Sequence, residues 1–315
     1  MRAHVALRLS CALAAVLAAA CDGGAAPGLD GGPDAAVDAG EDSGTDAGAD
    51  GGADAGTDGG ADAGEVDASV DTDSCGDEVV ESDFEFTDAG TLVALSGVTH
   101  VVGSVTVSSP GIVDLLPLAS LRCIDGDLRV TDCPSLAHLT GLEGLVYVGG
   151  SLIVGWNGAL ADTEGLAGLG LIGGAAWLTS NPSLETVDLP ALASLGVDLL
   201  VTENSSLSGV DVSALTATGG NLEISYCGEI PGLSGLGALE SVGGALHLEA
   251  DPALIALDGL AALGAVGTGV FIEDNVALPT CEADDLVAQL DGFDGPQCIQ
   301  GNAADGCPDV TGGCP

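Results

Sequence analysis

The chain of 315 residues contains 51 glycines and only 3% aromatic residues, so it cannot fold around a conventional core of large aromatic side chains. The chain has 48 acidic and four basic residues, which gives a formal net charge of −44 at pH 7. This balance excludes the phosphate-neutralising surface of a nucleic-acid-binding protein, and it argues equally against docking on anionic lipid headgroups.

Residues 1–20 have the organisation of an export signal. Arg2 and Arg8 form a short basic region, and an apolar run follows from Leu9 to Ala20. At about 12 residues this run is too short for a bilayer span, which needs roughly 20. We therefore expect residues 1–20 to be removed from the mature protein.

The end of this segment carries a family resemblance. The sequence Leu17-Ala18-Ala19-Ala20-Cys21 places small residues directly before a cysteine and resembles the lipobox of bacterial lipoproteins, with Ala18 where that family more often has Leu. The resemblance implies that Cys21 becomes the diacylated N-terminus, and several acyl chains anchor a protein more stably than one. An ordinary secretory signal, with Cys21 incidental, is the alternative.

A lipid anchor implies a place in the bacterial cell envelope, at the outer membrane or the cell surface. Asp22 follows the cysteine and would favour the periplasmic face of the inner membrane under the enterobacterial sorting rule, so both locations stay open. Residues 1–20 hold two of the four basic residues and none of the acids, so their removal leaves a formal charge of −46.

Residues 21–74 are predicted to be the acylated cysteine followed by a disordered tether. The segment is almost entirely Gly, Ala, Asp, Ser and Thr, and aspartate recurs every four residues from Asp30 to Asp62. That period is helical, but each intervening glycine costs about 1 kcal/mol relative to alanine, and aspartates four apart repel each other. The oxygen spacing of a calcium loop is also missing. We expect a spacer that holds the following domain away from the membrane.

A short repeat, with a period of about two dozen residues, dominates the rest of the chain. Eight segments in register begin at Gly103, Gly126, Gly150, Gly174, Val197, Gly220, Gly244 and Thr268. Apolar residues two and four places into each segment are typical of a short strand with one buried face. Another apolar residue stands at the tenth place, in Val113, Leu136, Leu160, Leu184, Leu207, Ile230, Leu254 and Leu278. The seventh place holds Pro110, Cys133, Asn157, Asn181, Asn204, Cys227, Asp251 and Asn275, and an inward Asn there can satisfy backbone groups at a bend.

Each segment is interpreted as one coil of a solenoid, which is stable only when it is stacked on its neighbours. We therefore predict a mainly β fold, a single-stack parallel β-solenoid of about eight coils over residues 75–280. Thin layers of Leu, Val and Ala would then form the core. One interior column is expected to contain Leu128, Leu152, Leu199, Leu222 and Leu246.

Two stretches of the repeat, GGSLIV…N…L and SNPSLETV…L, are similar to the receptor L-domain. This is the leucine-rich right-handed β-helix of insulin- and epidermal-growth-factor-type receptors and of fungal and bacterial surface proteins. The resemblance covers roughly residues 97–280 and is strongest at Ser180-Asn181-Pro182-Ser183-Leu184. It implies an extracellular ligand-binding or structural module without catalysis, and it brings no receptor contact residues. A leucine-rich-repeat horseshoe fits the period too, whereas the valine-rich, glycine-bounded coils favour the straighter helix.

Eight cysteines remain once Cys11 and Cys21 are set aside, which suits an oxidising compartment. Cys133 and Cys227 lie at equivalent places about 19 Å apart, beyond the roughly 7 Å reach of a disulfide, so both are expected to be free and buried. The other six cluster at the ends of the repeat. Loop lengths favour the pairs Cys75–Cys123, Cys281–Cys298 and Cys307–Cys314, with another pairing among the last four as the alternative.

Residues 281–315 are expected to form a Cys-rich C-terminal cap. Glu282 to Leu290 has the pattern of a short helix, N-capped by Thr280 and with acids in its first turn, that closes the end of the solenoid. A zinc site would need a CxxC spacing or a histidine partner. Neither is present, so we predict no metal and no other cofactor.

The sequence offers no recognisable catalytic group. Some parallel β-helices are polysaccharide lyases, which combine calcium-bound carboxylates with a basic residue. Here lysine is absent, and Arg122 and Arg129 are the only strong cations of the folded region. The four histidines are scattered, and no nucleophile with its base is visible. We expect a non-catalytic protein, with a polysaccharide-active β-helix enzyme as a distant alternative.

The outward third place of the strands is predicted to form a candidate binding face. Its members are Arg129, Ile153, Trp177, Leu200, His247 and Phe271, and Glu223 interrupts them. Adjacent exposed Ile, Trp and Leu side chains mark a binding surface more often than scattered ones. Recognition of a protein or glycan partner is therefore the expected function. The alternatives are loops that cover the row, packing of Trp177 on Ile153, and a passive envelope spacer.

Overall fold

A computed structural model describes residues 72–311, 313 and 314. The expected signal segment 1–20, the lipid-attachment residue Cys21 and the tether up to residue 71 lie outside the described residues. The last residues of the expected tether belong to a 3-10 helix, Thr72–Cys75.

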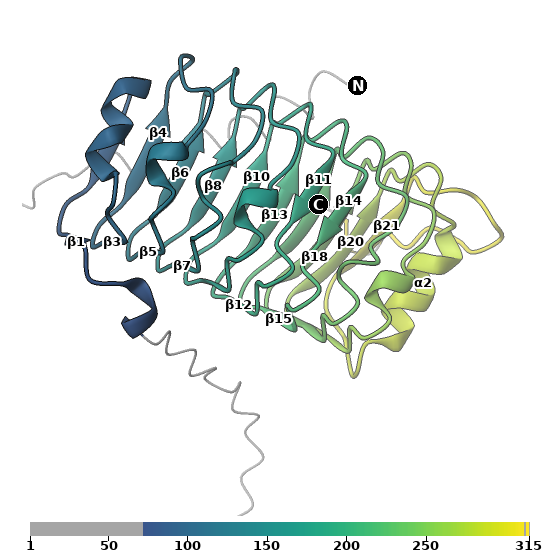
Figure 1. Ribbon diagram of the computed structural model, residues 1–315. Helices are drawn as coiled ribbons and strands as arrows, with labels where there is room; N and C mark the ends of the chain where they lie inside the picture. The colour runs from purple at the N-terminus through teal and green to yellow at the C-terminus, as the bar shows by residue number, and fades with distance from the viewer. Residues whose placement is uncertain (1–71, 312, 315) are drawn as a thin grey trace, which may run out of the picture. The chain divides into compact units, whose positions relative to one another are not determined.

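The described chain is mainly β, as predicted, and consists of two long parallel sheets consistent with a β-solenoid (Figure 1). The main sheet contains β2 (Phe84–Phe86), β4 (Val105–Ser108), β6 (Leu128–Thr131), β8 (Leu152–Gly155), β10 (Ala176–Thr179), β13 (Leu199–Thr202), β16 (Leu222–Ser225), β18 (Ala245–Glu249), β20 (Gly269–Glu273) and β21 (Gln297–Gln300). The narrow sheet contains β1 (Val79–Val80), β3 (His100–Val101), β5 (Cys123–Ile124), β7 (Tyr147–Val148), β9 (Leu171–Ile172), β12 (Ser194–Leu195), β15 (Ala217–Thr218), β17 (Ser241–Val242) and β19 (Ala265–Val266). A short sheet pairs β11 (Thr186–Asp188) with β14 (Gly209–Asp211).

The strand register follows the sequence repeat. Leu128 pairs with Leu152 across β6 and β8, and Leu199 pairs with Leu222 across β13 and β16. The predicted interior column is confirmed, because Leu128, Leu152, Leu199, Leu222 and Leu246 are all fully buried. Alternation along each strand therefore places two apolar side chains per coil, such as Leu128 and Val130, into a continuous core.

Two strands of the main sheet lie outside the eight predicted segments. β2 comes before the first segment and pairs with β4, while β21 comes after the last one and pairs with β20. The sequence repeat does not reveal β21, because Val270 pairs with Gln297 and this interval is longer than the period of the repeat. The extra residues accommodate helix α2 (Thr280–Gln289), so the segment expected as a cap also extends the main sheet.

In the first segment, the predicted seventh and tenth places are wrong by one residue. Val113 is 61% exposed and Ile112 is buried in its place, while Ser109 rather than Pro110 takes the seventh place and donates its N–H to Cys133 Sγ at 3.4 Å. In later coils one left-handed residue, such as Asp132 with φ 54°, separates the strand from that place. The first coil lacks this residue and is shorter there.

Buried polar side chains at the seventh place, which we call rungs, bind each coil to the one before it. Asn181 Oδ1 accepts the N–H of Asn157 at 3.0 Å, and Asn181 Nδ2 donates to the carbonyl of Val154 at 3.0 Å. Asn157 does the same with Cys133 and Val130. A rung therefore needs an acceptor and a donor on one short side chain, which explains the choice of Asn.

Helix α2 begins earlier than predicted. The expected helix ran from Glu282 to Leu290 with Thr280 as N-cap, but Thr280 is its first residue, and the cap position, Pro279, makes no side-chain cap. Thr280 instead donates its hydroxyl to the carbonyl of Ala303 at 3.1 Å. The other short helices are of the 3-10 type, at Ala89–Leu95, Leu116–Leu118, Glu164–Leu166 and Asp258–Leu260.

Three disulfides lie near the two ends of the described chain. Cys75–Cys123 is as predicted, but the pairs Cys281–Cys298 and Cys307–Cys314 are wrong, because the structure joins Cys281 to Cys307 and Cys298 to Cys314. Cys298 lies on β21, and residues 310–313 pair with that strand through Ile299 and Gln297. This pairing brings Cys314 to Cys298. Loop length could not predict it, since it depends on β21. Cys133 and Cys227 are free and buried, which confirms that prediction.

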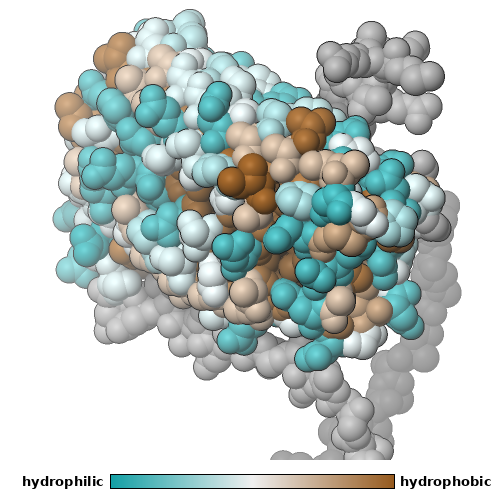
Figure 2. Space-filling view, turned by 90° about the vertical axis from the view of Figure 1, so that its right-hand side faces the viewer, coloured by the Kyte–Doolittle hydropathy of each residue, from teal (hydrophilic) through white to brown (hydrophobic). Residues whose placement is uncertain are grey.

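Figure 2 views the end of the stack that carries α2 and β21. Hydrophobic residues lie there in small groups among hydrophilic ones. Gln289 of α2 donates to the carbonyls of Leu260 and Leu263 at 2.8 and 3.0 Å, so the helix satisfies backbone groups of the preceding coil. This end of the core is covered by chain that departs from the repeat.

The rungs predict a graded response to mutation. Asn181→Ala removes three hydrogen bonds inside the core and should lower the free energy of unfolding by about 2–4 kcal/mol. Asn181→Cys should cost clearly less, because cysteine already serves as a rung at two places. Urea unfolding followed by circular dichroism measures both variants. Equal losses would show that a cysteine cannot replace the hydrogen bonds of Asn181 at this place.

The disulfide pairing can be read directly by peptide mapping. Cleavage before Asp284, Asp294, Asp305 and Asp309 under non-reducing conditions puts each of the last four cysteines on its own peptide. Mass spectrometry should find the Cys281 peptide linked to that of Cys307, and the Cys298 peptide linked to that of Cys314. The Cys298→Ser/Cys314→Ser variant opens a loop of 16 residues and should lose about 3 kcal/mol of stability. A Cys281–Cys298 peptide would contradict the structure.

Candidate functional site

The predicted binding face lies along one surface of the main sheet. Its members are register partners on successive strands, in the order Arg129, Ile153, Trp177, Leu200, Glu223, His247 and Phe271. We call these seven side chains the outer row. Because neighbouring parallel strands lie about 4.8 Å apart, consecutive members of the row are side by side.

The exposure of the outer row is lower than predicted. Ile153 is only 4% exposed, so the expectation of an exposed Ile, Trp and Leu side by side is wrong at its first member. Its register partners on either side are the long side chains of Arg129 and Trp177. Trp177, Leu200 and the remaining members are half-buried. Sequence alternation identifies an outward position, but not how far large neighbours cover it.

The two ends of the outer row differ in chemistry. At one end the Arg129 guanidinium forms an ion pair with the Asp127 carboxylate at 2.7 Å. Asp127 directly precedes β6, the strand that carries Arg129, so this carboxylate does not come from a neighbouring strand. At the other end the rings of His247 and Phe271 stack with centroids 4.5 Å apart. Trp177 lies between them, and its indole Nε1 has no hydrogen-bond partner among the described residues.

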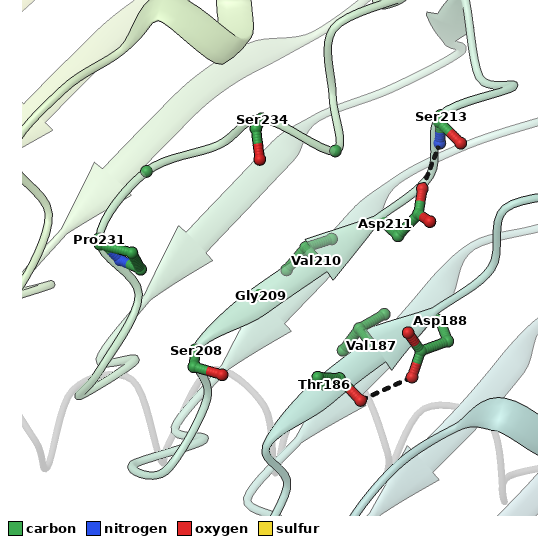
Figure 3. A pocket seen from close by; sticks show the side chains of 12 residues that line it. Thr186, Val187, Asp188, Ser208, Gly209, Val210, Asp211, Ser213, Pro231 and Ser234 are labelled. Atoms are coloured by element: carbon green, nitrogen blue, oxygen red, sulfur yellow. Dashed lines mark hydrogen bonds between the residues drawn. The ribbon is translucent and has the colours of Figure 1, made fainter.

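A groove of about 500 Å³ lies elsewhere, over the short sheet formed by β11 and β14 (Figure 3). Its floor includes Thr186, Asp188 and Asp211, and its wall is the segment from Pro231 to Gly235. The adjacent segments that begin at Gly174 and Val197 are each one residue shorter than the segments before and after this pair. In these two coils a short β-strand, β11 or β14, takes the place of the 3-10 turn found in some other coils, such as Glu164–Leu166.

Two carboxylates line the groove. Asp188 and Asp211 are register partners, Asp188 accepts the hydroxyl of Thr186 at 2.6 Å, and Asp211 accepts the N–H of Ser213 at 3.0 Å. Each carboxylate keeps its second oxygen free of these bonds, as Figure 3 shows for the labelled side chains. The sequence pattern did not predict this groove. The slight shortening of these two segments was its only signal.

The remaining reactive groups of the described chain are engaged in structure. Two clusters of possible metal ligands occur among the described residues, around Glu273 and Asp305, but both draw their sulfur atoms from disulfides. A disulfide sulfur is not the thiolate that binds a metal. Burial raises the pKa of the Cys133 and Cys227 thiols, so both stay protonated. They donate weakly to strand carbonyls as rungs.

Comparison with known proteins yields no match. No family model matches the sequence, no curated protein is similar to it, and no solved structure matches its fold. Within the residues that the structure describes, no helix has the length and apolar character needed to cross a bilayer.

Proposed function

We propose that this chain is a non-catalytic, lipid-anchored protein of the bacterial cell envelope that presents its outer row to a protein or glycan partner. The observation that carries the proposal is the composition of the row. Arg129, Trp177, Leu200, Glu223 and His247 follow each other on a rigid sheet with only Ile153 intervening. An aromatic and apolar centre with a polar rim is the usual anatomy of a recognition site.

The fold proposed for this module is a single-stack, right-handed solenoid of the receptor L-domain type, with about eight coils of 23–24 residues. Its right-handedness is supported by the parallel pairing of successive main-sheet strands, since crossovers between parallel strands are right-handed in about 98% of cases. The leucine-rich interior and the Asn rungs support the comparison with the L-domain. The fold alone does not determine a ligand, so the proposal depends on the outer row.

The absence of catalysis is part of the proposal. It is supported by the buried, protonated state of both free thiols and by the pairing of Arg129 with Asp127. With that pairing, no free arginine or lysine remains on the described main sheet to abstract a proton in lyase-type chemistry.

The lipid anchor predicts a specific labelling result. Expressed in a bacterium that is fed radiolabelled palmitate, the full chain should incorporate label and sediment with membranes, because diacylated Cys21 would be its N-terminus. Cys21→Ser should abolish labelling and release the protein. Cys11→Ser is the matched control and should behave like the parent. A parent chain that incorporates no label would refute the anchor and leave the ordinary secretory signal, and labelling that persists in Cys21→Ser would show that Cys21 is not the attachment site.

The outer row predicts selective protection on cells. Hydroxyl-radical footprinting of whole cells, compared with the purified protein, should show protection of Trp177 and His247 by the bound partner. Trp156 is 37% exposed and lies outside the row, so it serves as the internal control. Equal reactivity of all three residues in both samples would favour the passive spacer.

A pair of double variants separates recognition from stability. Trp177→Ser/Leu200→Ser should abolish the protection of His247 and leave the thermal unfolding midpoint little changed, because both side chains are half-buried on the surface. Ile255→Ser/Val276→Ser alters two apolar side chains that are 56% and 65% exposed outside the row, and it should keep the protection. If both double variants retained the protection of His247, the row would not be the site.

A further inference from the structure

The rung at Asp251 breaks the chemical rule that the other rungs obey. Each amide rung accepts an N–H from the previous coil and donates to a carbonyl of the previous strand. Asn275, in the next coil, accepts the N–H of Asp251 at 2.9 Å and donates to the carbonyl of Leu248 at 2.9 Å. The donor is essential, because a buried carbonyl without a partner is costly.

Asp251 makes only the first of these two hydrogen bonds, the one in which the side chain accepts a backbone N–H. Its Oδ1 accepts the N–H of Cys227 at 2.8 Å, and the side chain is completely buried. Its Oδ2 has no hydrogen-bond partner among the described residues. This oxygen is the counterpart of the amide nitrogen in Asn157, Asn181 and Asn275. An ionised carboxylate has no hydrogen to donate from it.

We propose that the folded protein holds Asp251 in its protonated form at neutral pH, with Oδ2–H donating to the carbonyl of Ile224. Ile224 stands 27 residues before Asp251, the spacing that joins Asn157 to Val130 and Asn275 to Leu248. The neutral carboxylic acid then supplies the acceptor and the donor that a rung needs. The carboxylic acid O–H takes the place of the amide N–H as the donor. The stability of the stack at this coil therefore depends on pH.

The surroundings of Asp251 all favour the neutral acid. The adjoining rungs are the protonated thiol of Cys227 on one side and the amide of Asn275 on the other. The charged groups that act on it from its own coil and the preceding one are Glu249 and Glu223, both acidic. Burial, with these charges, raises the pKa of Asp251 to about 8, although the N–H of Cys227 lowers it. No cation contributes to this balance.

The effect on stability has a definite sign. The pKa of Asp251 is higher in the folded chain than the value of about 3.9 in the unfolded chain, so the folded state retains a proton that the unfolded state releases. The contribution of this rung is therefore complete below about pH 4. It is lost progressively as the pH rises to about 8, and above that value no further loss follows. The solenoid should loosen first between the coils that contain Cys227 and Asp251.

Asp251→Asn provides the test, since Asn is the residue found at the neighbouring rungs. Urea unfolding of the full chain at pH 5 to 9 gives the unfolding constant of each protein. The ratio of the parent constant to that of Asp251→Asn should rise about tenfold per pH unit between pH 5 and 7.5 and level off above about pH 8. Asp274→Asn, at an exposed neighbouring aspartate, should follow the parent at every pH.

Two further measurements keep the test decisive. Asn181→Asp moves the same group to a distant rung and should add a second pH-dependent loss of similar slope. Carbon-13 NMR of carboxyl-labelled protein should show one resonance that titrates near pH 8 and is missing in Asp251→Asn. A constant ratio of unfolding constants, or an Asp251 carboxyl that is already ionised at pH 6, would overturn the proposal.

Discussion

The stack depends on one hydrogen-bonded bend that recurs in nearly every coil. After each regular main-sheet strand a single left-handed residue, such as Ser180 with φ 57° or Glu203 with φ 58°, turns the chain, and the next residue points its polar side chain inward. A left-handed non-glycine residue costs roughly 1–2 kcal/mol. The rung offsets that cost by satisfying a backbone N–H and a carbonyl that the bend removes from water. Side chains of Asn, Cys and Asp meet the same demand with different donors.

Glycine has a corresponding role at the opposite corner of the coil, between the narrow and the main sheets. A Cβ on Gly196 would collide with the carbonyl oxygen of Gly173, and one on Gly219 with that of Gly196. Stacked coils approach each other so closely there that only a hydrogen atom fits. Glycine at this corner is therefore a packing requirement of the stack, and the scarcity of aromatic residues follows from thin layers.

The sequence predicted what the repeat imposes and missed what happens where the repeat stops. Leu152 and Asn181 stand at places that every segment of the repeat enforces, so their burial could be read from the period. Val113, β21 and the Cys298–Cys314 pair lie where a coil is shortened or interrupted, and there pairing depends on contacts far apart in the sequence. The half-covered state of Trp177 and the groove over β11 and β14 depend on side-chain size and on one missing residue. No periodic pattern encodes either of them.

The contrast between interior and exterior supports the proposal of recognition over that of passive spacing. Interior places repeat almost without change, because every layer has the same shape to fill. The outer row has no such constraint, and no two of its seven members are the same residue type, from Arg129 to Phe271. A spacer would need only soluble side chains there, and this chain has acidic residues in excess. Placing Trp177, Leu200 and Phe271 on that surface reduces solubility, which a spacer has no reason to give up, so their presence favours the proposed partner.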